Sequence, residues 1–157
     1  MLIRSFQKED IQPLIEILRA TGAFRPEEIE VAVELMNIVV EEPQQQDYIM
    51  YTAVDEAGVV RGYYCVGPTA MTLGTFDLYW IAVDPATQRK HIGTELLKHC
   101  HALVQSQQGR LIVVETSSQP KYDPTRLFYV RNGYSEEARI KDYYAAGDDL
   151  VIYTKHL

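Results

Sequence analysis

The sequence has 157 residues, of which 46% are hydrophobic, enough apolar material for one folded domain with a single core. Its formal net charge of −7 argues against non-specific binding to nucleic acid or to a membrane surface, because both require clustered positive charge. No apolar run is long enough to cross a membrane, and charged residues follow the N-terminus too soon for a signal peptide, so we expect a soluble, cytoplasmic protein.

The first part of the chain predicts a short strand, two amphipathic helices and a β-hairpin. Residues 2–5 form the strand, and the first helix carries apolar residues at helical spacing from Ile11 until it ends near Gly22. Pro26 is a favourable first residue for the second helix. Residues 48–54 and 59–66 are rich in aromatic and β-branched side chains and are separated by Asp-Glu-Ala-Gly, which favours a hairpin.

Charge is distributed unevenly along the chain. Residues 1–60 contain 12 acidic and 4 basic side chains, a net charge of −8, whereas residues 61–157 contain 10 acidic and 11 basic ones, a net charge of +1. An acidic first part suits a cationic substrate, and a neutral remainder suits a phosphate-rich cofactor. The alternative is that the glutamates of the second helix only solvate its surface.

The middle of the chain predicts a strand, a turn and a helix that together form an anion site. The strand covers residues 76–83, and apolar residues from Ile92 to Val104 keep helical spacing. A turn entering a helix leaves backbone N–H groups unpaired at the positive end of the helix dipole. Gly93 removes a Cβ where a pyrophosphate could approach, and Arg89 and Lys90 add positive charge nearby.

The last part of the chain predicts a buried strand, a short helix and two closing strands. The strand covers residues 111–114 and closes on Glu115-Thr116-Ser117. Asp123 is a good N-cap and Pro124 a good first residue for the helix, which ends at Asn132-Gly133. The closing strands, residues 134–140 and 150–156, flank a loop over residues 141–149.

The motifs of the second half resemble the GNAT acetyltransferase superfamily over nearly the whole chain. They run in the order strand, Q-x-x-x-x-G turn, helix, strand, and then Leu127-Phe128-Tyr129 followed by Gly133-Tyr134. The resemblance implies one α+β domain over residues 1–157, with a central, mostly antiparallel, splayed sheet of six to seven strands and about four helices. The strand ending at Val83 and the strand ending at Glu115 would splay apart.

The resemblance also implies acetyl-CoA as the cosubstrate, bound in the splay without a metal. Backbone groups of Ile81, Ala82 and Val83 would hold the pantetheine. The pyrophosphate would lie on the turn, formed by Gln88, Arg89, Lys90, His91, Ile92, Gly93 and Thr94.

The chain departs from the family pattern at two positions, His91 in the turn and Tyr122 before the last helix. His91 replaces the first glycine of the turn; if this residue needed a positive φ, its Cβ would cost on the order of 1 kcal/mol. Tyr122 stands where the family often has an asparagine, seven residues before its conserved tyrosine, and its hydroxyl could make a polar contact to the cofactor.

Two residues match the catalytic positions of the family. Tyr129 resembles the general acid that protonates the departing CoA thiolate, and Glu115 matches the general base of acetyltransferases that modify protein N-termini. Asp77, on the strand that enters the turn, is the alternative base. Each could instead be structural, Tyr129 as a packing aromatic and Glu115 as a buried or substrate-binding carboxylate.

Three functions are compatible with these features. The first is N-acetylation of a small amine or amino-acid-like metabolite, favoured by the acidic first part. The second is acetylation of a peptide or protein N-terminus, suggested by Glu115 and by Tyr143 and Tyr144 in the 141–149 loop. The third is a non-catalytic acyl-CoA-binding module, suggested by His91 and Tyr122. Exposed strand edges are compatible with a homodimer.

Several other residues are expected to be structural. Cys65 and Cys100 lack the spacing of disulfides or zinc ligands, so we interpret both as buried small hydrophobes. His99 and His101 have no partner at metal-binding spacing, and we expect both at the surface. Most strand tyrosines, including Tyr63, Tyr64 and Tyr79, are expected in the core.

Overall fold

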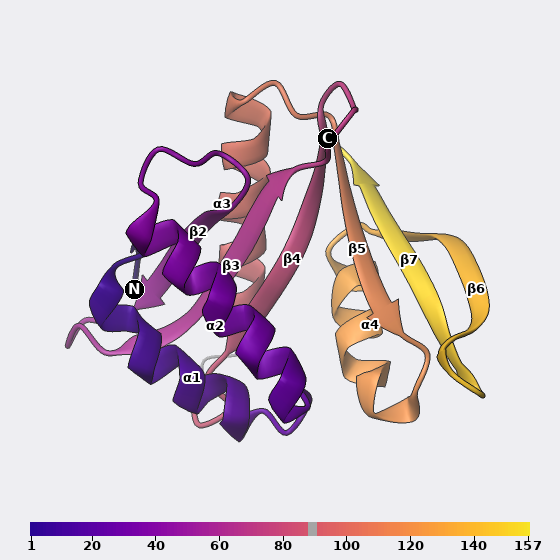
Figure 1. Ribbon diagram of the computed structural model, residues 1–157, viewed down its shortest axis with the longest axis horizontal. Coiled ribbons are helices and arrows are strands. Elements are labelled where there is room, and N and C mark those ends of the chain that lie inside the picture. Colours follow the sequence, from indigo (N-terminus) through magenta and orange to yellow (C-terminus); the bar gives the residue numbers. More distant parts are fainter. Residues whose placement is uncertain (88–90) are drawn as a thin grey trace.

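One mixed β-sheet runs through the structure, a computed structural model that describes residues 1–87 and 91–157. Its strand order is β1-β2-β3-β4-β5-β7-β6, and every neighbouring pair is antiparallel except β4 and β5 (Figure 1). The strands are β1 Leu2–Ser5, β2 Ile49–Val54, β3 Val60–Pro68, β4 Thr75–Val83, β5 Leu111–Ser117, β6 Ser135–Ala145 and β7 Asp148–His156.

Two pairs of helices cover the two faces of the sheet. They are α1 Ile11–Ala20, α2 Pro26–Glu41, α3 Ile92–Ser106 and α4 Asp123–Arg131, with short 3-10 turns at Lys8–Asp10 and Pro120–Tyr122. Buried residues of α1 and α2 form one core with β2, β3 and β4, and α1 and α2 lie in front of these strands in Figure 1. Buried residues of α3 and α4 form a second core on the opposite face, which continues across β5 and β7.

The parallel pair β4 and β5 stays together only at its beginning. Thr75, Phe76 and Asp77 pair with Leu111, Ile112 and Val113, and no pairing continues beyond them. In β4 the register with β3 moves from Leu78 to Trp80, so Tyr79 forms a bulge just after the strands separate. The predicted splay between the strands ending at Val83 and near Glu115 is therefore confirmed.

The end of the chain differs from the prediction. The expected loop over residues 141–149 is mostly strand, because β6 continues to Ala145 and pairs with Asp148 through a wide bulge. Asp142 has a φ of 54° and its carboxylate accepts a hydrogen bond from the Gly147 N–H at 2.7 Å. Asp149 in turn accepts the Asp142 N–H at 3.0 Å. These local side-chain contacts fold the segment back onto the sheet, which the turn-forming composition alone did not indicate.

Both cysteines, and the histidines in the middle of α3, are packed rather than exposed. Cys65 and Cys100 are free and fully buried, as expected. The prediction that His99 and His101 lie at the surface is wrong, because both are half-buried. His99 Nδ1 lies 2.8 Å from the Tyr64 hydroxyl, and His101 Nε2 lies 2.9 Å from the Tyr134 hydroxyl. No helix among the described residues is long and apolar enough to cross a membrane.

Candidate active site

The second half of β4 presents an open edge to the gap between the diverging strands. Ile81, Ala82 and Val83 pair with Tyr64, Tyr63 and Gly62 of β3 on one side, whereas β5 no longer runs alongside them on the other. Backbone N–H and C=O groups on such an edge need partners. An extended chain of amides, such as pantetheine, is chemically suited to supply them.

The N-terminus of α3 is the candidate anion site. The N-cap residue His91 makes no side-chain hydrogen bond to the first turn, and Glu95 is the first residue to donate back to it, at 2.9 Å. Within the described part of the chain, the N–H groups of Ile92, Gly93 and Thr94 thus have no protein acceptor. Such N–H groups at the positive end of a helix suit a phosphate.

The structure changes the interpretation of two residues of this turn. His91 has a φ of −116°, which any residue adopts, so replacing glycine there introduces no backbone strain. The Cβ that Gly93 lacks would lie 3.1 Å from the ring of Phe128 on α4, so the glycine makes room for this ring. The predicted contacts of Gln88, Arg89 and Lys90 lie outside the described residues.

An ion-pair network fixes the point where the chain leaves β4. The Asp84 N–H donates to the Arg61 carbonyl at 2.8 Å, and the Asp84 carboxylate binds the Arg61 guanidinium at 2.9 Å. Arg61 also binds Asp55, in the turn between β2 and β3, at 2.9 Å. The hairpin thus supports the start of the turn that leads to α3.

Tyr129 enters the site from the α3–α4 face of the sheet. It is 4% exposed and packs among the rings of Phe128, Tyr134 and Tyr153. Burial raises the pKa of its phenol well above the usual value of 10, so the group stays protonated at neutral pH. Its hydroxyl makes no hydrogen bond to a described residue, although the side chain is almost fully buried.

Both candidate bases lie on the other face of the sheet. Phe76 and Leu78 of β4 and Val114 of β5 belong to the α3–α4 core. Because neighbouring residues of a strand point to opposite faces, Asp77 and Glu115 point toward the α1–α2 side. The Asp77 carboxylate accepts a hydrogen bond from the Thr69 hydroxyl at 2.7 Å. Glu115 is exposed and makes no side-chain hydrogen bond to any described residue. Glu115 is therefore the freer of the two carboxylates.

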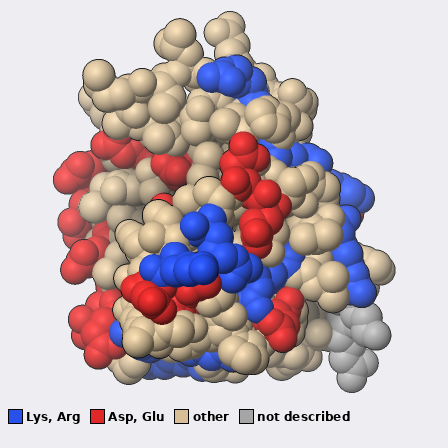
Figure 2. Space-filling view, turned by 90° about the vertical axis from the view of Figure 1, so that its right-hand side faces the viewer, with Lys and Arg blue, Asp and Glu red and all other residues tan. Residues whose placement is uncertain are grey.

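The charges of carboxylates from three elements, β5, β7 and α2, act on Tyr144. Burial and then the charge of Glu115 raise the pKa of Tyr144 to about 12, with further contributions from Asp148 and Glu28. Asp148 begins β7, is 9% exposed and accepts a hydrogen bond from the Ser117 hydroxyl at the end of β5. Figure 2 shows acidic side chains along its left margin. This margin corresponds to the front of Figure 1, where α1 and α2 lie.

Tyr122 is oriented toward the same side. Its hydroxyl donates to the carbonyl of Ala23, between α1 and α2, at 2.7 Å. Burial raises the pKa of Tyr122, and the charges of Glu28 and Asp148 raise it further. The proton of this hydroxyl is therefore used within the chain, and the expected contact to the cofactor stays a prediction.

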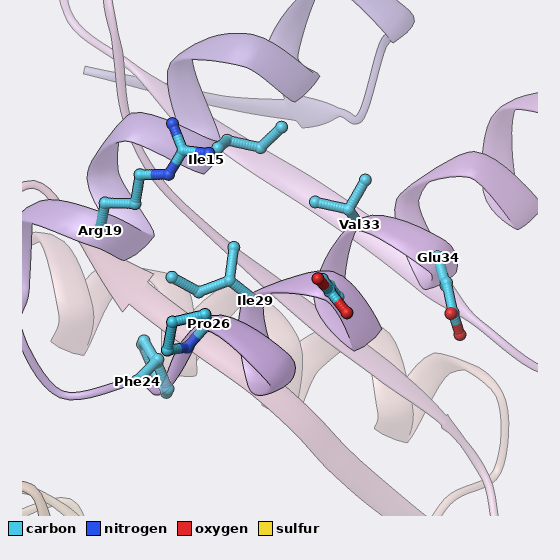
Figure 3. A pocket seen from close by; sticks show the side chains of 8 residues that line it. Ile15, Arg19, Phe24, Pro26, Ile29, Val33 and Glu34 are labelled. Atoms are coloured by element: carbon cyan, nitrogen blue, oxygen red, sulfur yellow. The ribbon is translucent and has the colours of Figure 1, made fainter.

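A separate cavity of about 670 Å³ lies between α1 and α2 (Figure 3). Its walls are apolar at Ile15, Ile29 and Val33, and Arg19 and Glu34 lie toward opposite ends of it in Figure 3. Phe24 lines the cavity and also packs against Trp80 of β4, with ring centroids 5.1 Å apart.

The sequence did not reveal several residues of this site. Asp148 and Arg61 become relevant only through contacts with distant elements, and no local pattern marks them; Phe128 belongs to a recognised motif, but its contact with Gly93 is seen only in the structure. Among the residues that the structure describes, no group of three His, Cys, Asp or Glu side chains could hold a metal ion.

Comparisons with known proteins agree with this geometry. The family described as acetyltransferase (GNAT) domain matches residues 46–136. No curated protein sequence matches the chain. A crystal structure of a protein from Desulfovibrio desulfuricans, assigned to the acetyltransferases of the GNAT family, is 40% identical, with a TM-score of 0.93 and coverage of 99% of this chain and 98% of that chain.

Two more distant structures share the fold. An aminoglycoside 6′-N-acetyltransferase in complex with coenzyme A is 19% identical, with a TM-score of 0.77 and coverage of 99% and 97% of the two chains. A ribosomal-protein-alanine N-acetyltransferase from Brucella melitensis is 18% identical, with a TM-score of 0.73 and full coverage of both chains, 100% each.

Proposed function

The chain belongs to the GNAT acetyltransferase family and is an acetyl-CoA-dependent N-acetyltransferase, and we propose that its acceptor is the primary amine of a small cationic or amino-acid-like molecule. The observation that carries this proposal is the placement of two carboxylates at the ends of paired strands beside the gap: Glu115 near the end of β5, exposed and without a side-chain hydrogen bond to a described residue, and Asp148 at the start of β7, hydrogen-bonded to Ser117 of β5. Carboxylates attract an ammonium group and orient it by charge-assisted hydrogen bonds.

The residues of the open β4 edge and of the α3 N-terminus are suited to bind the cosubstrate. Ile81 to Val83 would pair with the amides of the pantetheine, and the N–H groups of Ile92, Gly93 and Thr94, which have no acceptor among the described residues, would bind the pyrophosphate. Acetyl-CoA supplies the acetyl group as a thioester. These backbone contacts would hold its carbonyl in the gap between β4 and β5.

Tyr129 and Glu115 would act on opposite sides of this gap. Glu115, on the α1–α2 side, would accept the proton that the acceptor ammonium loses before the neutral nitrogen attacks the carbonyl carbon. Tyr129, on the α3–α4 side, would donate its phenolic proton to the sulfur as the carbon–sulfur bond breaks. Each proton transfer is worth roughly 10² to 10⁴ in rate when well placed.

A peptide or protein N-terminus is the second candidate acceptor. The observation that favours it is the bulged end of β6, where Tyr143 and Tyr144 are exposed at 55% and 46% next to Glu115. Exposed aromatic side chains at the mouth of a site are suited to pack against an extended peptide.

The test is thiol release from acetyl-CoA with a panel of diamines, amino sugars, amino-acid amides and short peptides. We expect turnover with small dicationic amines, and a rise in their KM of about tenfold for Asp148→Asn, which removes one charge but keeps the shape. Glu136→Gln on the exposed strand β6 is the matched control. Preference for peptides would favour the second candidate, and preference for uncharged amines would contradict the role of the carboxylates.

A further inference from the structure

The connection between α1 and α2, residues 21–25, is fixed to both of the strands that diverge. We call it the bridging loop. On one side, the ring of Phe24 packs against Trp80 of β4, with centroids 5.1 Å apart. On the other side, the Ala23 carbonyl accepts the hydrogen bond from Tyr122, which follows β5, at 2.7 Å.

The two anchor points lie on opposite sides of the gap. Trp80 immediately precedes Ile81 on the open part of β4, beyond the last residue that pairs with β5. Tyr122 ends the 3-10 turn between β5 and α4. Since one loop contacts both, it spans the gap on the α1–α2 side, where Glu115 and Asp77 also point.

The bridging loop also determines where α2 begins. Arg25 precedes α2, and its backbone N–H and guanidinium both donate to the Glu28 carboxylate at 3.1 Å. Glu28 is one of the charges that act on both Tyr122 and Tyr144. A shift of Ala23 would therefore move Arg25, two residues later, and with it the Glu28 carboxylate that Arg25 binds.

We propose that Tyr122 is a positioning residue that fastens the bridging loop across the diverging strands and so determines which acceptor amines bind. The Tyr122 hydroxyl holds the loop at Ala23, the loop places Glu28, and Glu28 with Asp148 and Glu115 forms the binding site for the ammonium. This inference rests on the proposed function, because it assumes that the acceptor binds beside these carboxylates.

The substitution Tyr122→Phe removes one hydroxyl and leaves the ring in place. We expect the KM for the best acceptor to rise about fivefold to tenfold, the equivalent of one lost hydrogen bond, and the relative rates among acceptors to change. The dissociation constant of CoA, measured by calorimetry, and kcat should stay within about twofold. Tyr48→Phe is the matched control, because Tyr48 is half-buried against Tyr79 and makes no hydroxyl hydrogen bond to a described residue.

A role of Tyr122 in cofactor binding predicts the opposite pattern. In that case Tyr122→Phe would weaken CoA binding and leave the acceptor KM unchanged, which would overturn the proposal. No change in either quantity would overturn it as well. The variant Phe24→Leu loosens the second anchor, and its effect on the acceptor KM should be less than additive with Tyr122→Phe, because both act through one loop.

Hydrogen exchange separates failure of this inference from failure of the proposed function. Backbone amides of residues 21–28 should exchange faster in Tyr122→Phe than in the wild type, and this measurement needs no acceptor. Unchanged exchange would overturn the fastening role. A wild-type enzyme that acetylates none of the small cationic amines would instead overturn the proposed function, while faster exchange in the variant would still support the fastening.

Discussion

At the scale of single residues, the phenol of Tyr129 is the clearest candidate for chemistry. It is buried by aromatic neighbours, yet its hydroxyl is not bound to any described residue. A buried hydroxyl without a protein partner is normally costly, so a functional role for it is reasonable. Because burial raises its pKa, the phenol keeps its proton at neutral pH and has one to donate when the thiolate leaves.

We predict that Tyr129→Phe lowers kcat about 100-fold and leaves the KM for acetyl-CoA nearly unchanged, because only proton donation is lost. Steady-state rates at saturating substrates are the measurement. Since the pKa of Tyr129 is raised, the wild-type kcat should show no loss from its ionisation up to at least about pH 10.

Tyr153→Phe is the matched control for this prediction. Tyr153 stacks on Tyr129 in the same core and is 6% exposed, so the variant perturbs the same packing without touching the proposed acid. If Tyr129→Phe retained the wild-type kcat, or if both variants lost activity equally, Tyr129 would act through packing alone.

At the scale of elements, α3 and α4 meet closely beside the cofactor turn. Gly93 in the first turn of α3 lies against the Phe128 ring of α4, at a separation that leaves no room for a branched side chain. Phe128 precedes Tyr129, so the same contact also sets the position of the proposed acid.

We predict that Gly93→Val destabilises the fold by about 1 to 3 kcal/mol, because it overpacks the contact between α3 and α4. Urea unfolding would measure this loss, and Phe128→Leu in the same chain should recover at least about 1 kcal/mol of it by making space. If the double variant were no more stable than Gly93→Val, the loss of stability would not come from the contact with Phe128.

At the scale of the whole molecule, α3 connects the two halves of the splayed sheet. His99 contacts Tyr64 of β3 in the half formed by β1 to β4. His101 contacts Tyr134, which precedes β6 in the half formed by β5 to β7. Because β4 and β5 pair only over three residues, these contacts help to hold the two halves of the sheet in place relative to each other.

We predict that stability decreases as the pH falls from about 6.5 to about 4. Burial, and to a smaller extent the charge of Lys155, lowers the pKa of His101 to about 4, whereas an unfolded histidine titrates near 6.5. Between these values the unfolded chain binds a proton that the folded chain does not, so stability present above about pH 6.5 is lost progressively.

Thermal unfolding across this pH range tests the prediction. His101→Gln should remove part of the decrease, whereas His156→Gln, at an exposed position on β7, should leave it unchanged. An identical pH dependence in the wild type and in His101→Gln would show that other groups are responsible.

The sequence by itself determined most of the elements and the chemistry of the cofactor region. Pro26 begins α2 and Val83 ends β4 as predicted, because hydrophobic periodicity, proline and turn residues act over a few neighbouring positions. The motif around Gly93 and Tyr129 indicated the family for the same reason, since the residues of a binding turn are close in the chain.

Only the tertiary structure decided what several of these residues contact. Gly93 faces Phe128 and not open space, His101 is buried against Tyr134, and Tyr122 binds Ala23, which is 99 residues away in the sequence. No local pattern encodes such contacts, because they depend on how the helices pack and on where the strands separate. The sequence therefore determined the family and the position of the proposed cofactor turn, and the packing of distant elements determined which side chains lie beside the diverging strands.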